Sequence, residues 1–573
     1  MPYESRWTVD IPDCSLPTFL FKSPSAPLGS KRSFSDAARP ETHYLTRNSF
    51  RLWSQRFGLG LRRSPHFRKG DRVLLFSSND MFVPVVFMGI LCAGGIFTGA
   101  NPTFTPRELA HQLRDSGATY LLCADGSIDT GIEAAKLAGL DADRVFVYNA
   151  HIYDGPQPPL KGCRYWGDLV APAEDARGFA WDDLTGPGEC DTTLALNYSS
   201  GTTGLPKGVE ITHRNYVSNL IQVTLISQLH PDYEARNARA IWLCFLPLYH
   251  AYGQTFFVAV SFHRQVPVYV MPKFDFEKML EYIQRFRVTD LALVPPIAVL
   301  LAKHPAVDKY DLSSVETVGS GAAPLGRDVC AQVEKRLGRG INLKQGWGMT
   351  ECTCSLLGWD IMATSTSAAV GEPNANCSAK IVSEEEGGEG DDDGHREITS
   401  RGPQHVGELW CRGPNVMKGY WRNPKATAET LTPDGWLKTG DMAYVDEAGM
   451  FHIVDRKKEL IKVKGNQVAP AELEALLLEH DAIADAAVIG VPTEDGDEAP
   501  RAFVVRQPGK NVTEDQVKKF VEAKVVRYKF LKGGVEFVDA IPKNPSGKIL
   551  RRQIRDGARE KLRKEKAQKS ARL

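Results

Sequence analysis

YSSGTTGLPKGVE, residues 198–210, places three glycines, four serine or threonine hydroxyls and one lysine in thirteen positions. Glycines let a backbone turn so that its N–H groups face an anion, and the hydroxyls add further donors. The order differs from the common phosphate loop, G-x-x-x-x-G-K-S/T, because Lys207 here stands between Pro206 and Gly208. The stretch therefore indicates a loop that holds a phosphate chain, and the alternative is an ordinary surface loop of the same composition.

The composition is typical of a globular protein with several domains. The chain has 573 residues, of which 42% are hydrophobic and 24% charged, and its length allows roughly three or four domain-sized units. Lys plus Arg and Asp plus Glu each number 70, so no charge excess argues for nucleic acid or an anionic membrane as a partner. Eleven cysteines without a C-x-x-C pair favour a reducing compartment over a disulfide framework or a zinc site.

One apolar run, MFVPVVFMGILCAGGIFTGA (81–100), has the length of a membrane span. Pro84, four glycines and polar flanks on both sides argue against a span. We therefore expect a buried helix that packs through its small residues, and no transmembrane segment. The start of the chain shows no basic segment followed by an apolar core, so we expect no secretory signal.

Apolar β-rich runs alternate with helical runs along most of the chain, which predicts parallel sheet and an α/β fold. Strands are expected at 71–78, 118–125, 143–150, 240–248 and 289–296, and helices at 81–95, 106–117 and 128–140. The charged, glycine-rich run 383–397 is expected to be a surface loop. A compact helix-then-strand pattern begins after DRKKELIK (455–462), which indicates a further unit there.

Five further motifs follow the loop in a fixed order. They are VGSGAAPLGRD (318–328), QGWGMTE (345–351), GWLKTGDMAYVD (435–446), IVDRKKELIKVKGNQVAPAELE (453–474) and PKNPSGKILRR (542–552). Together they resemble the adenylate-forming superfamily of acyl-CoA synthetases, peptide-synthetase adenylation domains and luciferases, and the match is nearest to the 4-coumarate–CoA ligases. The resemblance covers about residues 45 to 555.

The resemblance implies a domain plan. We expect an α/β fold with a large N-terminal AMP-binding domain of sheet-and-helix subdomains and a small, mobile α+β C-terminal domain, joined by a hinge near Lys458. The expected bounds are 1–44 for an N-terminal extension, 45–456 for the large domain, 457–555 for the small domain and 556–573 for a basic tail. The end of that tail, RKEKAQKSARL, is expected to be disordered.

The same resemblance implies an ATP-dependent acid–thiol ligase. A carboxylate would attack the α-phosphorus of ATP and expel pyrophosphate, and the thiol of CoA would then attack the acyl-adenylate. Catalysis of the first step is mostly positioning and electrostatic stabilisation. The residues implied to grip the β- and γ-phosphates are Ser199, Ser200, Gly201, Thr202, Thr203 and Lys207. Glu351 would bind Mg²⁺, a hard cation that prefers oxygen, and Thr350 would approach the α-phosphate.

The nucleoside has its own implied contacts. Asp441 would hold both ribose hydroxyls, because an ionised carboxylate can accept two hydrogen bonds, and Arg456 would assist at the ribose or phosphate. Lys548 would bridge the α-phosphate and the substrate carboxylate. The residues implied to frame the adenine are Ala322, Gln345, Gly346 and Trp347, where Trp347 replaces the tyrosine that most relatives carry. Taken singly, each residue has an ordinary alternative. Asp441 and Arg456 also fit surface charges, Glu351 fits a residue favoured at a helix start by the dipole, and Lys548 fits one lysine of a basic tail. It is their motif order that indicates a site.

A different set of residues is implied in the thiol step. In this superfamily the small domain swings about its hinge and replaces Lys548 at the site with another face. The residues implied near the adenylate or CoA are Lys273, Lys458, Lys462, Lys464, Gly465 and Gln467. The chain departs from the pattern at Asn466, where relatives usually have an aromatic residue, so the CoA side of the site is the least certain part of the match.

The acid itself is left open by the sequence. LPLYHAYGQ (246–254) matches the motif whose His250 and Tyr252 line the acyl pocket, although His250 alone also fits a packed core histidine. TECTCSLL (350–357) replaces part of the usual pocket wall with Cys352, Cys354 and Ser355. Aryl, arylalkanoic and medium-chain fatty acids all remain candidates. A stand-alone acyl-AMP ligase that loads a carrier protein is the alternative function, and luciferase-like oxygenation is a rarer one. A binding homologue without activity is disfavoured because Glu351, Asp441 and Lys548 are all present.

The last three residues, Ala-Arg-Leu, conform to a small–basic–leucine variant of the S-K-L peroxisomal address. We therefore expect a peroxisomal import receptor as a partner and a peroxisomal location, with the cytoplasm as the alternative. A fluorescent protein fused to the N-terminus should give punctate peroxisomal signal, and removal of residues 571–573 should make that signal diffuse. Puncta that persist after the deletion would contradict the assignment.

Overall fold

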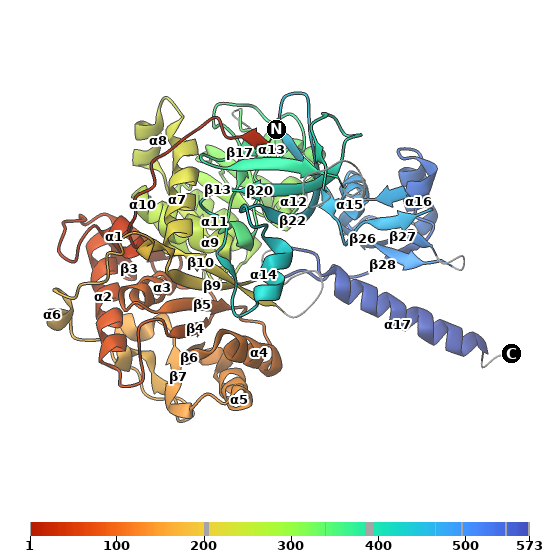
Figure 1. Ribbon diagram of the computed structural model, residues 1–573. Coiled ribbons are helices and arrows are strands. Elements are labelled where there is room, and N and C mark those ends of the chain that lie inside the picture. The colour runs from red at the N-terminus through yellow and green to blue at the C-terminus, as the bar shows by residue number, and fades with distance from the viewer. Residues whose placement is uncertain are drawn as a thin grey trace.

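The computed structural model describes residues 2–199, 206–338, 340–383, 395–464, 466–493, 497–544 and 547–570, with the backbone alone at 560 and 562–570 (Figure 1). Several positions singled out by the sequence lie outside the described residues. They are Ser200, Gly201, Thr202, Thr203, Gly465, most of the loop 383–397 and the last three residues.

The first sheet follows the alternation expected from the sequence. Strand β4 (Arg72–Phe76) pairs in parallel with β5 (Ile96–Ala100) and with β6 (Ala118–Ala124). The order across the sheet is β21-β10-β9-β5-β4-β6-β7-β8. The remaining bounds are β7 Val145–Tyr148, β8 Arg164–Tyr165, β9 Thr193–Ser199, β10 Lys207–Thr212 and β21 Gly419–Tyr420. Since β10 runs antiparallel to β9, the expected phosphate loop connects two neighbouring strands at one end of this sheet.

The second sheet is also mainly parallel and has the order β15-β14-β13-β11-β12-β2-β3. Its bounds are β2 Arg32–Asp36, β3 Tyr44–Thr46, β11 Trp242–Cys244, β12 Val268–Val270, β13 Asp290–Leu293, β14 Thr317–Ser320 and β15 Lys344–Gln345. The expected strands at 240–248 and 289–296 are thus confirmed as β11 and β13. The motifs that begin at Val318 and Gln345 follow or include the ends of neighbouring strands, so the sheet brings them together.

The third sheet is antiparallel, with the order β1-β18-β20-β22-β23 and β19 added beside β18. Its bounds are β1 Tyr3–Glu4, β18 Ser378–Val382, β19 Glu397–Ile398, β20 Gly407–Arg412, β22 Leu437–Val445 and β23 Phe451–Arg456; β16 Leu357–Gly358 pairs separately with β17 Glu372–Pro373. Residues 1–44, expected as an extension, supply β1 to this sheet and β2 to the second sheet.

Helices cover the sheets of the large domain (Figure 1). Their bounds are α1 Leu16–Phe21, α2 Arg47–Arg63, α3 Val83–Cys92, α4 Pro106–Ser116, α5 Ile128–Ala138, α6 Ala173–Ala176, α7 His213–Gln228, α8 Tyr233–Arg239, α9 Ala251–Gly253, α10 Ser261–His263, α11 Phe276–Phe286, α12 Pro295–Lys303, α13 Arg327–Leu337 and α14 Pro424–Thr430. A π-helical turn, Gln254–Val260, joins α9 to α10.

Local chemistry sets the ends of the helices, as α4 shows. The Thr105 hydroxyl accepts a hydrogen bond from the Glu108 backbone, and the Glu108 carboxylate accepts one from the Thr105 backbone at 2.8 Å. This reciprocal pair satisfies donors that a helix start leaves free. Gly117 ends α4 at φ +64°, a left-handed conformation that glycine adopts without a Cβ penalty.

The apolar run 81–100 forms a buried helix and a buried strand. Every residue of α3 is buried, and a Cβ added at Gly89 would lie 2.7 Å from the Phe57 ring and 3.0 Å from the Ser54 carbonyl oxygen. Helices α2 and α3 therefore pack at short range through this glycine. Among the described residues, no helix is long and apolar enough to cross a membrane.

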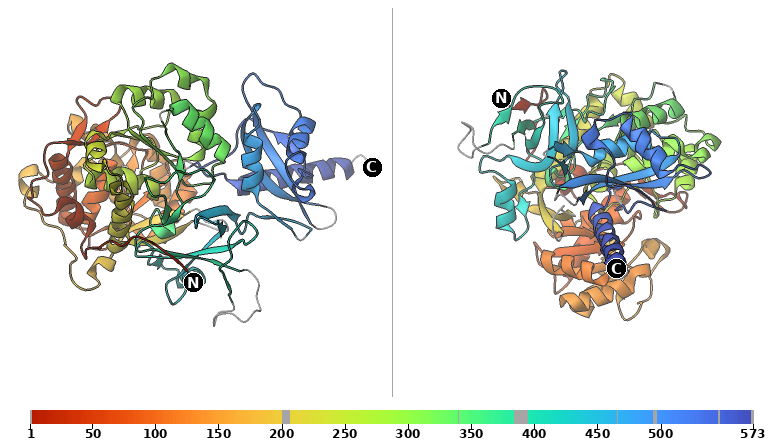
Figure 2. Two further views of the ribbon diagram at one scale, coloured as in Figure 1. Left: turned by 90° about the horizontal axis from the view of Figure 1, so that it is seen from above. Right: turned by 90° about the vertical axis from the view of Figure 1, so that its right-hand side faces the viewer.

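The small domain has its own core (Figure 2). Strands β26 (Ile483–Pro492), β27 (Glu498–Arg506) and β28 (Val535–Phe537) form a sheet. Helices α15 (Pro470–Leu478) and α16 (Glu514–Glu522) pack against it, and the hairpin of β24 (Ile461–Val463) and β25 (Asn466–Val468) precedes them. Separate buried clusters in this domain and in the large domain agree with the expected division into two domains.

The basic tail departs from the expectation of disorder. Helix α17 runs from Arg551 to Ser570, and Figure 1 shows it extending away from the small domain. Ile554 and Ala558 in its first half are buried against the cluster that contains Ile489 and Phe503. This anchored start provides a nucleus, and the Lys, Arg, Glu and Ala residues that follow favour propagation of the helix.

Polar contacts fix the small domain on the large one. Lys303 of α12 donates from Nζ to the carbonyl oxygens of Leu478 at 2.6 Å and Ile483 at 2.8 Å. Near the expected hinge, the Asp455 carboxylate accepts a hydrogen bond from the Ala471 backbone at 2.8 Å. These contacts hold the segment that contains Lys548 against the large domain.

Candidate active site

A cavity of about 940 Å³ is lined by both domains. Its walls come from the ends of the second sheet, the 3₁₀ turn Thr350–Cys352, the β9 end and the segment from Lys543 to Gln553. The predicted residues that line it are Ser199, His250, Tyr252, Ala322, Gln345, Gly346, Trp347, Thr350, Glu351, Arg456 and Lys548. The structure therefore brings together, in one place, most of the residues expected for the first step.

The two ends of the expected phosphate loop, Ser199 of β9 and Pro206 just before β10, line the cavity. Ser199 and Lys207 face each other in register across these strands, and the Ser199 hydroxyl donates to Glu351 Oε1 at 3.1 Å. Lys207 Nζ lies 4.9 Å from the centre of the Tyr420 ring. The two ends of the loop are thus fixed beside the carboxylate that was expected to bind a metal.

Glu351 is held by two hydroxyls and is 5% exposed. Besides Ser199, the Tyr420 hydroxyl donates to the same Oε1 at 2.9 Å. Burial and the neighbouring Glu351 raise the pKa of Tyr420 far above its usual value, so this hydroxyl stays a donor. Sequence reasoning missed Tyr420, because only the pairing of β21 with β10 brings it to the site.

Trp347, Asp441 and Arg456 form a connected group. The Trp347 indole Nε1 donates to Asp441 Oδ2 at 2.8 Å, and Arg456 Nε lies 3.3 Å from Asp441 Oδ1. Asp441 and Arg456 are opposite each other in β22 and β23, and Asp441 is 6% exposed. The carboxylate is therefore fixed from both sides, although each oxygen can still accept from a ligand hydroxyl.

Gln345 lines the cavity and also holds a neighbouring loop in place. Its side-chain oxygen accepts from the Leu325 backbone at 2.8 Å, and its nitrogen donates to the Leu325 carbonyl at 2.9 Å. The amide thus holds the loop that contains Ala322, which has a left-handed backbone at φ +73°. Gly346 donates its backbone N–H to the Ser320 carbonyl at 2.9 Å, so these residues shape one wall.

Lys548 reaches the cavity from a tight turn of the small domain. The Asn544 side chain accepts from the Lys548 backbone at 2.8 Å, and the Asn544 backbone donates to the Lys548 carbonyl at 2.9 Å. Burial and the nearby Arg456 cation lower the pKa of Lys548 to about 8, against the opposing pull of Asp441 and Glu351. The lysine is therefore a cation near neutral pH and becomes neutral more readily than free lysine.

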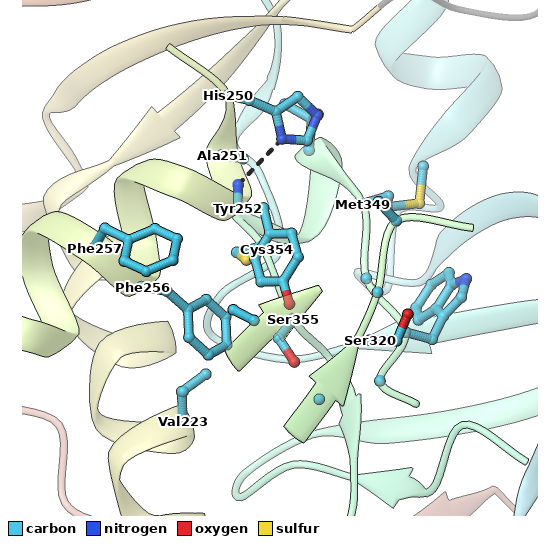
Figure 3. Close-up of a pocket in the computed structure, with 18 of the residues that line it drawn as sticks. Val223, His250, Ala251, Tyr252, Phe256, Phe257, Ser320, Met349, Cys354 and Ser355 are labelled. Carbon is cyan, nitrogen blue, oxygen red and sulfur yellow. Dashed lines mark hydrogen bonds between the residues drawn. The ribbon is translucent and has the colours of Figure 1, made fainter. Parts of the chain in front are cut away.

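His250 and Tyr252 lie close together in the lining of the cavity (Figure 3). His250 Nδ1 accepts from the Tyr252 backbone N–H at 3.3 Å, and burial together with the Lys548 cation lowers the pKa of His250 to about 4. The imidazole is thus neutral at physiological pH. The Tyr252 and Phe256 rings meet edge to face at 5.1 Å.

Two of the three replacements after Thr350 line the cavity. Cys354 and Ser355 are wall residues, and Figure 3 shows both beside Tyr252. Cys352 does not take part, contrary to the expectation, because its side chain is fully buried and its Sγ lies 3.7 Å from Cys411 Sγ. The short turn at Thr350–Cys352 directs Glu351 and Cys352 to different sides.

The residues expected for the thiol step lie outside the cavity. Lys273, Lys458, Lys462, Lys464 and Gln467 are all exposed and do not line it. The Lys462 backbone N–H donates to Glu498 Oε2 at 2.9 Å, inside the small domain. In this arrangement the small domain presents Lys548, and not Lys462, to the site.

Comparisons with known proteins agree with this geometry. A model of the AMP-binding enzyme family matches residues 29–421, and one of the AMP-binding enzyme C-terminal domain matches residues 472–548. 4-Coumarate–CoA ligase 2 of Narcissus pseudonarcissus is 39% identical over 91% of this chain and 87% of its own. 4-Coumarate–CoA ligase 3 of Arabidopsis thaliana is 39% identical over 90% and 85%. The crystal structure of ATP-bound MatB from Rhodopseudomonas palustris superposes with a TM-score of 0.77, at 26% identity over 95% of this chain and 98% of that one.

The lowered pKa of Lys548 predicts that activity is lost at alkaline pH. Its cation is present below about pH 8 and is lost as pH rises through that value, so kcat/KM for ATP–pyrophosphate exchange should fall there, because kcat/KM reports the free enzyme. Lys548→Arg, which stays charged, should move the fall to higher pH. Identical profiles for the two proteins would contradict this role for Lys548.

The Trp347 hydrogen bond predicts a nucleotide effect. Trp347→Phe keeps an aromatic ring but loses the N–H that orients Asp441, so the dissociation constant for ATP should rise about tenfold, or ~1.4 kcal/mol. The preference for ATP over 2′-deoxy-ATP should fall as well. The control is Trp410→Phe, at a buried tryptophan of β20 outside the cavity whose Nε1 has no hydrogen-bond partner among the described residues. Equal effects of both variants would count against the assignment.

Proposed function

Because this chain belongs to the AMP-binding enzyme family and is an AMP-forming acyl-CoA ligase, we propose how its own residues divide the reaction. The acid is activated in the cavity while Lys548 faces it, and the acyl-adenylate is transferred to CoA after the small domain turns. The observation that carries this proposal is the position of Lys548. It comes from the small domain, yet it lines the same cavity as Arg456 and Glu351 of the large domain.

In the first step the acid lies beside Tyr252, with its carboxylate toward Lys548 and the phosphate chain beside Ser199 and Lys207. Lys548 neutralises the carboxylate and the α-phosphate, so that two anions can approach. A carboxylate oxygen then bonds to the α-phosphorus and pyrophosphate leaves. Asp441, fixed by Trp347 and Arg456, accepts from the ribose hydroxyls and holds the nucleotide in line.

His250 supports this step as a neutral group. Its lowered pKa keeps it uncharged at neutral pH, so it adds no further cation next to Lys548. Its Nδ1 is occupied by the Tyr252 backbone N–H, which leaves the other ring nitrogen for the acyl side. We assign His250 the task of fixing the turn that carries Tyr252 and of bordering the carboxylate.

A magnesium ion fits the residues at the phosphate end. Mg²⁺ is usually bound by one or two carboxylates together with substrate phosphates and water. Among the described residues no group of three or more His, Cys, Asp or Glu side chains is arranged to hold a metal ion, and Glu351 with its two hydroxyl neighbours offers one carboxylate. Glu351 would hold the ion, which would offset phosphate charge when bound.

The second step uses residues that are now exposed. A turn of the small domain about the hinge near Lys458 would withdraw Lys548 and bring Lys462, Lys464 and Gln467 to the adenylate, and Lys273 would meet the phosphates of CoA. The CoA sulfur bonds to the acyl carbon, the carbon–oxygen bond to AMP breaks, and AMP leaves. Lys548 and Lys462 are therefore both needed, Lys548 in the first step and Lys462 in the second.

Separate assays of the two half-reactions distinguish the role of Lys548 from that of Lys462. Lys548→Ala should lower acid-dependent pyrophosphate release by about 10²–10³-fold, the usual cost of removing one stabilising group at an active site, yet still convert added acyl-adenylate to thioester. Lys462→Ala should retain pyrophosphate release and lose thioester formation. Lys519→Ala, at an exposed lysine of α16, is the control and should change neither step. Equal losses in both half-reactions for the two site variants would refute the division of labour.

A further inference from the structure

We propose that the acyl part of this cavity accepts an acid of about ten carbon atoms whose far end carries an acceptor oxygen, such as a second carboxylate or a ketone. This inference rests on the proposed function and specifies its substrate. It follows from three features of the cavity, which are a floor left open at a glycine, an apolar wall and a polar far end that contains Arg264.

The floor is formed by neighbouring parallel strands, of which β13 and β14 present the small residues Ala292 and Gly319. Ala292 of β13 is opposite Gly319 of β14, and Gly319 is opposite Lys344 of β15. All three residues line the cavity. A Cβ added at Gly319 would have a single neighbour within 4 Å, the Lys344 carbonyl oxygen at 3.8 Å. The space above Gly319 is therefore open, and any larger side chain would project into it.

The length of the floor sets the length of the acid. Gly321 lies at the reaction end, where an added Cβ would be 3.6 Å from the Tyr252 ring, and Thr317 lies four residues back along the same chain. At about 3.3 Å per residue this is ~13 Å. A carbon–carbon bond of about 1.5 Å advances an extended chain by about 1.3 Å, so about ten carbons fill that distance.

The opposite wall is apolar and suits a hydrocarbon chain. It consists of Val223 and Ile226 of α7 and of Phe256, Phe257 and Val260 of the π-helical turn. Figure 3 shows Val223, Phe256 and Phe257 on one side of the drawn group and Ser320 on the other. Burial of such a chain against this wall contributes about 0.8 kcal/mol per methylene group, so the wall favours longer acids.

The far end of the cavity is polar. Arg236 and Arg264 line it together with the carboxylates of Glu316 and Asp290, and Arg236 Nε lies 3.8 Å from Glu316 Oε2. Glu316 is already bound by two contacts from Arg239, at 2.7 and 2.9 Å. A second cavity of about 40 Å³ shares this end of the wall, so a polar terminal group has room there.

Arg264 is the group best placed to meet that terminal oxygen. Its Nε donates to Asn237 at 3.0 Å and its Nη1 to Ser227 at 3.0 Å. Within the described residues it makes no ion pair, and Nη2 has no assigned acceptor. A guanidinium that is fixed by two neutral partners and keeps free N–H groups is suited to bind an acceptor oxygen.

The test uses purified full-length enzyme with hexanoate, decanoate, 9-oxodecanoate and decanedioate, each assayed for acid-dependent pyrophosphate release. The wild type should prefer decanoate to hexanoate by at least about tenfold, and at least one oxygen-bearing acid to decanoate by about fivefold. Gly319→Leu should lower the decanoate-to-hexanoate ratio of kcat/KM at least tenfold, and Gly319→Ala should lower it less. Gly319 has no left-handed φ, so these changes cause no backbone strain.

Arg264→Gln should abolish the preference for the oxygen-bearing acids over decanoate, whereas Arg285→Gln, at an exposed arginine of α11 outside both cavities, should preserve it. A wild type that prefers hexanoate, with ratios unchanged in both Gly319 variants, would overturn the length assignment. An unchanged preference in Arg264→Gln would overturn the polar-end assignment. Absence of acid-dependent pyrophosphate release with every acid, cinnamate included, would instead count against the proposed function.

Discussion

A lysine from the small domain must sit beside carboxylates that the large domain buries, and the rest of the site depends on this one contact. Burial of an unpaired cation costs several kcal/mol, and the lowered pKa of Lys548 reflects that cost. Asp441 and Glu351 offset part of it, while Arg456 adds to it. The two cations, Lys548 and Arg456, equal the two carboxylates in number. The phosphate chain of ATP therefore adds an excess of negative charge. Lys207, and the Mg²⁺ that we propose at Glu351, would compensate that excess.

The fold supplies this contact through strand register and one tight turn. Antiparallel pairing of β22 with β23 places Asp441 opposite Arg456, and the turn closed by Asn544 projects Lys548 toward both. The small domain is held by polar contacts, such as Lys303 to Leu478, and the turn that we propose would have to exchange them. A lysine supplied by the smaller domain suits the proposed reaction in two steps.

The sequence predicted most of the fold and the first-step site, because ordered motifs and alternating strands and helices are local signals. Contacts made by pairing distant segments were not predictable, and Tyr420 reaches Glu351 only through the pairing of β21 with β10. The directions of side chains within one motif could not be predicted either, since Cys352 contacts Cys411 while Cys354 lines the cavity. The position of Lys462 relative to the cavity could not be predicted from the sequence either, because it depends on how the two domains are oriented.

In the proposed first step, a carboxylate oxygen of the acid bonds to the α-phosphorus of ATP in the cavity that Lys548 completes. This bond can be followed with oxygen-18 from a carboxylate labelled at both oxygens, with mass analysis of AMP and pyrophosphate after one turnover with CoA. We expect one labelled oxygen in AMP and none in pyrophosphate, since cleavage of the acyl carbon–oxygen bond leaves the bridging oxygen on AMP. Unlabelled AMP, or label in pyrophosphate, would contradict this step.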